Sequence, residues 1–126
     1  MRVIFRTLLL ALLASTSTVL FANSLMEKTL ENKVSDSEAV FIGQVISLQT
    51  YHEPGVGGVQ DASVAIKTSL KGSATGVVKV ESKGLFAEGD PLPLKVGANY
   101  LFFVRKMDRD AYVSVNGRFG VYKLPR

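Results

Sequence analysis

The chain has 126 residues and a formal net charge of +4, which is enough for one domain and too little for two hydrophobic cores of ordinary size. Hydrophobic residues make up 47% and charged residues 21%, the composition of a folded protein rather than a disordered one. The absence of cysteine and the single histidine exclude disulfide bonds, thiol nucleophiles, cysteine zinc sites and any triad or metal site that needs two histidines.

The first 22 residues have the pattern of a signal peptide. Two arginines precede the apolar run 8–14, and small polar residues follow it before Ala22. This arrangement is typical of export signals, whereas a membrane-spanning helix needs roughly 20 apolar residues. We therefore expect a signal peptide over residues 1–22, one domain over 23–126, no membrane span after cleavage, and a periplasmic or secreted location. An uncleaved anchor is the alternative, because Leu20 is larger than the residue usual at its position before a cleavage site.

Cleavage would also change the charge balance. Loss of Arg2 and Arg6 takes the formal net charge from +4 to +2. Nucleic-acid binding requires a concentrated basic surface, so we expect no nucleic-acid partner. An exported domain without cysteine must be stable through its core alone, which suits a bacterial envelope.

The exported chain is predicted to begin with a short helix over residues 24–34. Apolar residues recur there at four-residue spacing, and Ser24 and Glu27 have the spacing of a capping box. The alternative is a frayed tail, since a helix of this length is marginal unless it packs on something.

Alternation of apolar and polar residues predicts the first strand at residues 39–51, with a glycine in its middle where a bulge or bend would fall. Its apolar face would carry Val40, Ile42, Ile46 and Leu48. One face of this strand is therefore expected to meet the core.

Three further segments continue the β pattern. Glycine and proline predict a flexible loop at residues 51–60, followed by a half-buried strand at 61–70 and a short strand at 77–82. Residues 83–97 hold two prolines and three glycines and are expected to form a long irregular connection. Either of the two irregular segments is a candidate binding surface.

The last third of the chain contains the most apolar segment of the domain. Residues 100–104 are apolar on both faces, which predicts a central strand that is covered on both sides. Strands at 112–115 and 119–124 flank Asn116 and Gly117, a pair typical of two-residue hairpin turns. About six strands and one helix predict an all-β barrel or sandwich, and closure into a barrel would protect the apolar strand edges.

Four segments in this order resemble one protein family. They are residues 37–45 (SEAVFIGQV), 70–73 (LKGS), 97–103 (GANYLFF) and 116–120 (NGRFG). Together they resemble the bacterial members of the group whose OB-fold domain is similar to tissue inhibitors of metalloproteinases and netrin modules. The resemblance implies a small five-stranded Greek-key barrel, OB-fold-like, with a short N-terminal helix.

The same resemblance raises one alternative function, a metalloprotease inhibitor of altered mechanism. Animal inhibitors of this group use a disulfide-tethered N-terminal cysteine, whose amine and carbonyl chelate the protease zinc. The processed terminus here would be Asn23, and the chain has no cysteine. An untethered amine lacks the preorganisation that makes such an anchor tight, so the inhibitor mechanism does not transfer.

Two kinds of side chain are candidates for ligand binding. Tyr51 and Phe86 fall in or beside the irregular segments, where aromatic rings can stack on a sugar or a peptide; the alternative is that they belong to the core. Lysines on the second and third strands would form one basic stripe or, alternatively, an ordinary solvated face. These lysines are Lys67 and Lys79, with Lys71 and Lys83 nearby.

No catalytic, cofactor or metal site is predicted. His52 has no orienting partner, and Asp108 and Asp110 lack the remaining acidic ligands of a calcium loop. Asp36 and Glu38 suit the junction between helix and strand. We therefore expect a non-enzymatic module that needs no cofactor and binds an envelope or extracellular macromolecule, either a protein or a glycan.

Overall fold

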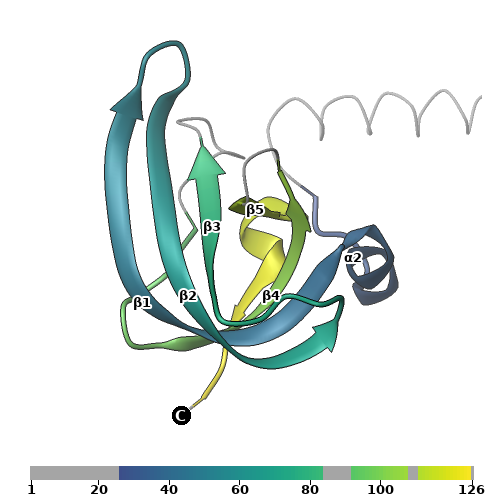
Figure 1. Cartoon of the computed structure of the whole chain (residues 1–126). Helices are drawn as coiled ribbons and strands as arrows, with labels where there is room; N and C mark the ends of the chain where they lie inside the picture. Colours follow the sequence, from purple (N-terminus) through teal and green to yellow (C-terminus); the bar gives the residue numbers. More distant parts are fainter. Residues whose placement is uncertain (1–25, 84–91, 108–110, 126) are drawn as a thin grey trace, which may run out of the picture.

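The computed structural model describes residues 26–83, 92–107 and 111–125, and these form one curved sheet with a short helix beside it (Figure 1). Its elements are α2 (Leu30–Asp36), β1 (Ala39–Glu53), β2 (Gly57–Lys71), β3 (Val77–Lys83), β4 (Asn99–Lys106), β5 (Ala111–Ser114), a 3-10 helix η2 (Gly117–Gly120) and β6 (Val121–Lys123).

Five of the strands form a closed ring. Their order is β1-β2-β3-β5-β4, and β4 pairs back onto β1. The β3–β5 pairing is parallel and the other pairings in the ring are antiparallel. Ring closure satisfies strand edges that would otherwise be exposed. The arrangement confirms the expected all-β, five-stranded barrel-like fold with a short helix.

The interior of the ring is built on aromatic residues of β1 and β4. Phe41 and Phe102 are both 0% exposed, and their ring centroids lie 5.2 Å apart. Tyr100 packs at 5.9 Å from Phe102. On the opposite face of β4, Phe103 joins a second cluster, and the ring of Tyr122 meets it edge-on at 5.9 Å. The prediction that residues 100–104 form a central strand covered on both faces is therefore confirmed.

The buried face of β1 differs from the predicted one. Phe41 and Val45 point into the ring, whereas Ile46 is exposed and Val40 belongs to the outer cluster. A register shift between Val45 and Ser47 changes the phase of the strand, so that Leu48 packs against the core again. Alternation could not assign the face, because apolar residues line both sides of the lower half of the strand.

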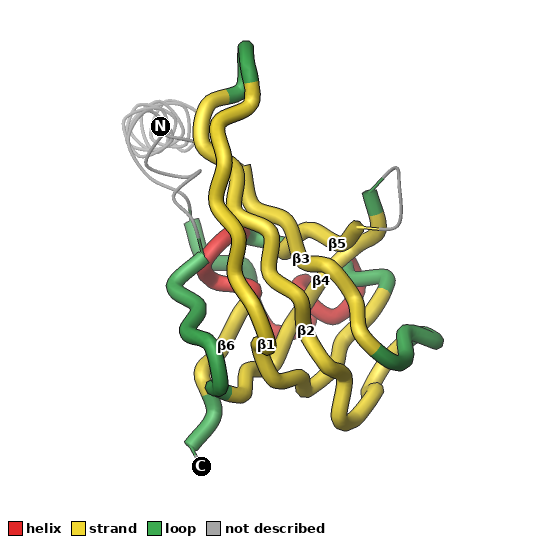
Figure 2. Tube along the Cα trace, turned by 60° about the vertical axis from the view of Figure 1, so that its left-hand side comes forward, coloured by secondary structure: helices red, strands yellow, loops and turns green. Residues whose placement is uncertain are grey.

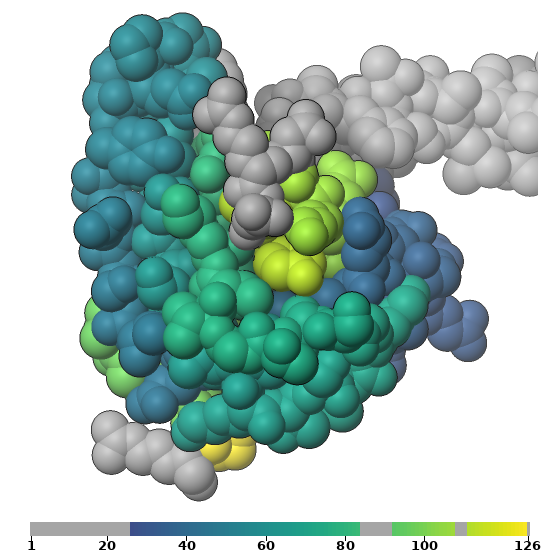
Figure 3. Space-filling view, in the orientation of Figure 1, coloured from purple at the N-terminus to yellow at the C-terminus, as the bar shows by residue number. Residues whose placement is uncertain are grey.

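Beyond the ring, β1 and β2 continue as a projecting hairpin (Figure 2). Tyr51 pairs with Val59, and the turn is confined to residues 54–56. The flexible loop expected at residues 51–60 is therefore wrong. Gly55 and Gly57 have φ angles of 81° and 101°, so these glycines close a tight turn. We call residues 46–63 the arm; it stands at the upper left of the space-filling view (Figure 3).

Asn116 and Gly117 do not form the expected hairpin. Both have positive φ angles, 106° and 56°, but the chain then enters η2. Strands β5 and β6 both pair with β4, so they lie end to end along one edge instead of pairing with each other. Gly120 allows this return, because a Cβ there would collide with the Ser114 hydroxyl.

The helix begins later than predicted. Thr29 caps α2 by accepting a hydrogen bond from the Asn32 amide at 3.2 Å, and Ser24 lies outside the described residues. Glu27 takes no part in a capping box; its carboxylate binds the Lys33 ammonium at 2.7 Å. Lys33 is 1% exposed and also contacts the hydroxyl and ring of Tyr122, which fixes α2 beside β6.

Three further expectations concern parts of the chain at or beyond the described ranges. The signal peptide expected at residues 1–22 lies outside them. Within the described ranges, no helix is long and apolar enough to cross a membrane. The connection expected at residues 83–97 is described only from Leu92 onward, and Leu92 and Leu94 pack into the core.

Candidate functional site

A hollow of about 510 Å³ lies between the distal part of the arm, β3 and the ends of β4 and β5 that face each other. It combines a phenol, two carboxylates and two ammonium groups with a methionine and an alanine. The residues that line it are Tyr51, Glu53, Lys79, Glu81, Lys83, Met107 and Ala111.

Strand alternation places the charged side chains on the outer face of the sheet. Val78 and Val80 pack against the core, so the residues between and beyond them on β3 face outward. Directly opposite residues of an antiparallel pair share a face. Asp61 of β2 lies opposite Glu81, and the buried Val59 lies opposite both Tyr51 and Lys83. The pairing of three strands thus assembles the hollow.

The lysines at the hollow are matched by carboxylates. Lys83 Nζ lies 3.2 Å from Glu81 Oε1 and 3.8 Å from Glu53 Oε2. Lys79 Nζ lies 3.9 Å from Asp61 Oδ2. A hydrogen bond and the negative charge of Glu81, followed by the charge of Glu53, raise the pKa of Lys83. The surface is therefore of mixed charge, and its carboxylates favour the protonated form of Lys83.

Asp61 is the most constrained acid of this group. Its side chain is 12% exposed, and its Oδ1 atom is buried without a hydrogen-bond partner among the described residues. Burial, and then the charge of Glu81, raise the pKa of this carboxyl, while Lys79 opposes the shift. A polar oxygen left in this condition costs free energy.

Tyr51 gives the hollow its largest exposed ring. The residue is 46% exposed. Desolvation, and then the charges of the neighbouring carboxylates, raise the pKa of its hydroxyl. The phenol therefore stays neutral over a wide pH range, and it offers an aromatic face together with a hydrogen-bond donor.

The structure brings together two of the four residues predicted to bind ligand, Tyr51 and Lys79. Lys67 lies exposed on β2, outside the lining of the hollow, and Phe86 lies outside the described residues. Of the remaining basic residues, Lys83 lines the hollow, whereas Lys71 donates a hydrogen bond to the Val34 carbonyl at 2.7 Å. The lysines of β3 therefore line the hollow, whereas the lysines of β2 lie outside it, and the four do not form one basic stripe.

The carboxylates of the hollow were missed from the sequence. Glu53 and Glu81, with Asp61 beside the hollow, share one face because β1 pairs with β2 and β2 pairs with β3. Glycine and proline suggested a loop at 51–60 instead. The usable signal was the alternation of Lys79, Glu81 and Lys83 on one face of the third strand, read together with a tight turn at 54–56.

The other polar residues considered from the sequence have structural contacts or lie elsewhere. Asp36 pairs with Lys28, and Glu38 accepts a hydrogen bond from the Lys106 amide at 3.2 Å. His52 is exposed in the arm. Asp108 and Asp110 lie outside the described residues. In the described ranges, no group of three or more His, Cys, Asp or Glu residues is placed to hold a metal ion.

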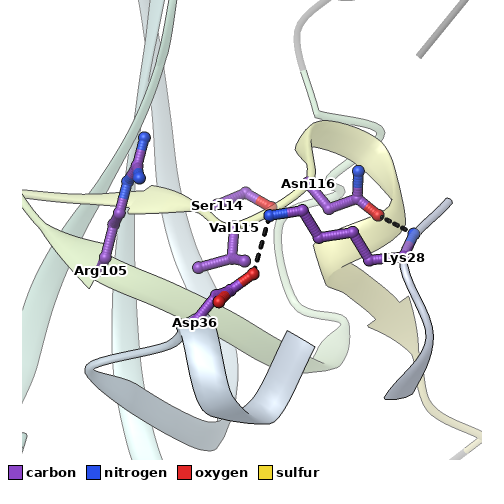
Figure 4. A pocket seen from close by; sticks show the side chains of 6 residues that line it. All are labelled: Lys28, Asp36, Arg105, Ser114, Val115 and Asn116. Carbon is purple, nitrogen blue, oxygen red and sulfur yellow. Dashed lines mark hydrogen bonds and ion pairs between the residues drawn. The ribbon is translucent and has the colours of Figure 1, made fainter. Parts of the chain in front are cut away.

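A second hollow, of about 350 Å³, lies between α2 and the β5–η2 turn (Figure 4). The Asn116 side chain accepts a hydrogen bond from the Lys28 amide at 2.6 Å and donates one to the Met26 carbonyl at 3.0 Å. Lys28 Nζ reaches Asp36 Oδ2 at 2.8 Å. These groups hold the segment before α2 against the barrel, which is a structural task.

The mixed-charge hollow at the arm can therefore offer ion pairs, hydrogen bonds and one aromatic contact to a partner. No protein-family model matches the chain, and no curated protein matches it. Any function must therefore be argued from the surface chemistry of the molecule itself.

Proposed function

We propose that the protein is an exported, non-catalytic binding module that holds a segment of a partner protein against the outer face of the arm. The observation that carries this proposal is the convergence of Tyr51, Glu53, Lys79, Glu81 and Lys83 around one hollow. No arrangement of the described residues specifically favours the alternative, a metalloprotease inhibitor.

The chemistry of the hollow favours a polypeptide over a glycan. Tyrosine and methionine are enriched in protein interfaces, where an aromatic anchor is typically surrounded by a polar rim. Tyr51 and Met107 would serve as the anchor, and the charges of both signs would form the rim. A partner segment with charges of both signs would match this surface.

The arm also supports the proposal through its backbone. Strand pairing continues to Glu53 and Gly57 at its end, so Tyr51 is carried on a paired strand rather than on a loose loop. A preorganised surface loses less conformational entropy when a partner binds. The arm is therefore suited to present its side chains to a macromolecule.

Site-specific photocrosslinking tests the binding face. A photoreactive phenylalanine analogue at Ser63, which lies opposite Lys79, should form one defined adduct with a partner protein in cells that make this chain natively. The same analogue at the exposed Thr68 of the same strand is the matched control and should form none. Tyr51→Ala should abolish the Ser63 adduct. Equal labelling at both positions, or an adduct that a glycosidase removes, would overturn the proposal of a protein partner.

Export is a separate part of the proposal, supported by the pattern of residues 1–22. The full chain with a C-terminal tag should be recovered from the cell envelope or the medium with an intact mass that begins at Asn23. Recovery of the full-length mass from the cytoplasm would contradict export and leave the binding test unaffected.

A further inference from the structure

The two edges of β1 are not equally paired. From Val40 to Gln44 the strand lies between β2 and β4, but from Ser47 to Glu53 its pairing is with β2 alone. Among the described residues, the Val45 backbone makes the last hydrogen bonds on the β4 side: its carbonyl accepts from the Gly97 amide at 2.7 Å, and its N–H donates to the Ala98 carbonyl at 3.1 Å. The edge over residues 46–53 is therefore open in the described part of the chain.

An open edge has definite chemistry. Alternate residues of a strand direct their N–H and C=O groups to one side, so this edge offers several unpaired donors and acceptors. Natural edge strands are usually guarded by charges or proline. Residues 46–52 read ISLQTYH and contain neither; the one charge of this edge is Glu53 at its end, followed by Pro54 in the turn. Side chains along this segment are mostly exposed, including Ile46 at 47%. The segment is thus a template for another strand.

We infer that this edge pairs with the same edge of a second copy of the chain, antiparallel and about a two-fold axis. The sequence of this edge is complementary to itself when the two copies run antiparallel. With Thr50 opposite its own copy, Gln49 meets Tyr51 and Ser47 meets Glu53, so the only charge on the edge faces a hydroxyl. Cross-strand threonine pairs are favourable, whereas like charges directly opposite are not.

The inferred pairing would join the two sheets into one continuous sheet. A two-fold axis perpendicular to a sheet keeps equivalent faces on the same side. The mixed-charge hollow of one copy and that of the other would therefore face the same direction, close to the paired edges. The inference rests on the backbone and sequence of the edge and does not require the proposed function.

Cysteine cross-linking provides the first test, because the chain has no cysteine of its own. Thr50→Cys should oxidise to a disulfide-linked dimer in dilute solution, since opposite residues in a strand pair approach closely enough for a disulfide. Thr68→Cys, an exposed threonine of β2, should remain monomeric. Equal cross-linking of both variants would overturn the inferred register.

Sedimentation of the folded chain provides the second test. The native sequence should form a concentration-dependent dimer, and Thr50→Lys should raise its dissociation constant by about tenfold or more, because two ammonium groups then face each other. The control Thr68→Lys should leave the dimer unchanged, and circular dichroism should report the same fold for all three proteins. A native chain that stays monomeric at its solubility limit, or a dimer that Thr50→Lys leaves intact, would overturn the inference.

Discussion

The two halves of β1 differ in their surroundings: the lower half, up to Val45, is paired on both sides, and the upper half is paired with β2 alone. Phe41 in the lower half is fully buried between neighbours on both sides, whereas Tyr51 in the upper half is half exposed and paired on one side. The register shift after Val45 separates the two halves. The difference teaches that the lower half of β1 contributes to the core, whereas the upper half displays side chains such as Tyr51 that lie outside the core clusters.

Phe41→Ala should produce the largest effect and break the lower half. The ring of Phe41 lies 5.2 Å from that of Phe102 and 6.2 Å from that of Tyr112. Truncating a buried aromatic residue costs about 3–5 kcal/mol, through lost transfer free energy and the cavity left behind. Urea denaturation should show this loss as a large fall in midpoint. A cost below about 1 kcal/mol would mean that the core does not centre on these rings.

Lys33→Ala should rank second, because it releases α2 from the outside of the ring. Lys33 binds Glu27 and Tyr122 from a buried position. Loss of its hydrogen bonds and of the packing of its stem should cost about 2 kcal/mol, measured by urea denaturation.

This ion pair also carries a pH signature. Hydrogen bonds from Lys33 and Tyr122 hold the pKa of Glu27 below its ordinary value of 4.5. A lowered acid pKa stabilises the fold above the ordinary value, and the contribution is lost as pH falls through the lowered one. Acidification through this pH window should therefore reduce the stability of the native protein by more than it reduces the stability of the Lys33→Ala variant. Parallel pH profiles for the two proteins would contradict this account.

Asp61→Asn should have a smaller effect of the opposite sign. The pKa of Asp61 is raised by burial and by Glu81, so the folded protein binds its proton more tightly than the unfolded chain. Stability from this group is therefore present below the ordinary pKa of 3.8 and is lost as pH rises through the folded value. Asparagine removes the charge and supplies a donor near Glu81.

At neutral pH we expect Asp61→Asn to stabilise the fold by about 1 kcal/mol, with the gain disappearing in acid. Thermal unfolding as a function of pH measures both. The control Asp36→Asn alters an exposed ion pair and should change stability by less. A destabilising Asp61→Asn would show that the carboxylate is well accommodated in the folded protein.

Tyr51→Ala should have the smallest effect on stability, within about 0.5 kcal/mol, because its ring lies outside the core clusters. Its contrast with Phe41→Ala is the sharpest test of the division, since both substitutions truncate an aromatic residue of one strand. A Tyr51→Ala variant that unfolds as readily as Phe41→Ala would erase the distinction between ring and arm.

The sequence was sufficient for the parts of the fold that depend on strong local patterns. Residues 100–104 are apolar on both faces, and β4 is covered on both faces. The same dense apolar pattern led to the wrong face of β1. Val40 and Phe41 are both buried, and only tertiary packing decides which of them points into the ring. Closure between β1 and β4 depends on contacts far apart in sequence, and local periodicity does not report them.

The turn residues correctly indicated the local backbone conformation but not which strands pair on either side of the turn. Asn116 and Gly117 adopt the positive φ angles that their side chains allow, but the partner of the following strand is β4. Gly55 and Gly57 likewise serve a tight hairpin rather than a loop. This second error concealed the candidate site, because the acids near Tyr51 share a face only when the arm is paired.

The contacts of Glu27 with Tyr122, and of Met26 with Asn116, join parts of the chain that are about as far apart in sequence as the described residues allow. Early and late segments of the domain are thus held together without a covalent link. Circular permutation exploits such proximity. A permutant that connects the two segments by a glycine-rich linker and opens the chain at Gly55 would keep the barrel and leave the two strands of the arm as new chain ends.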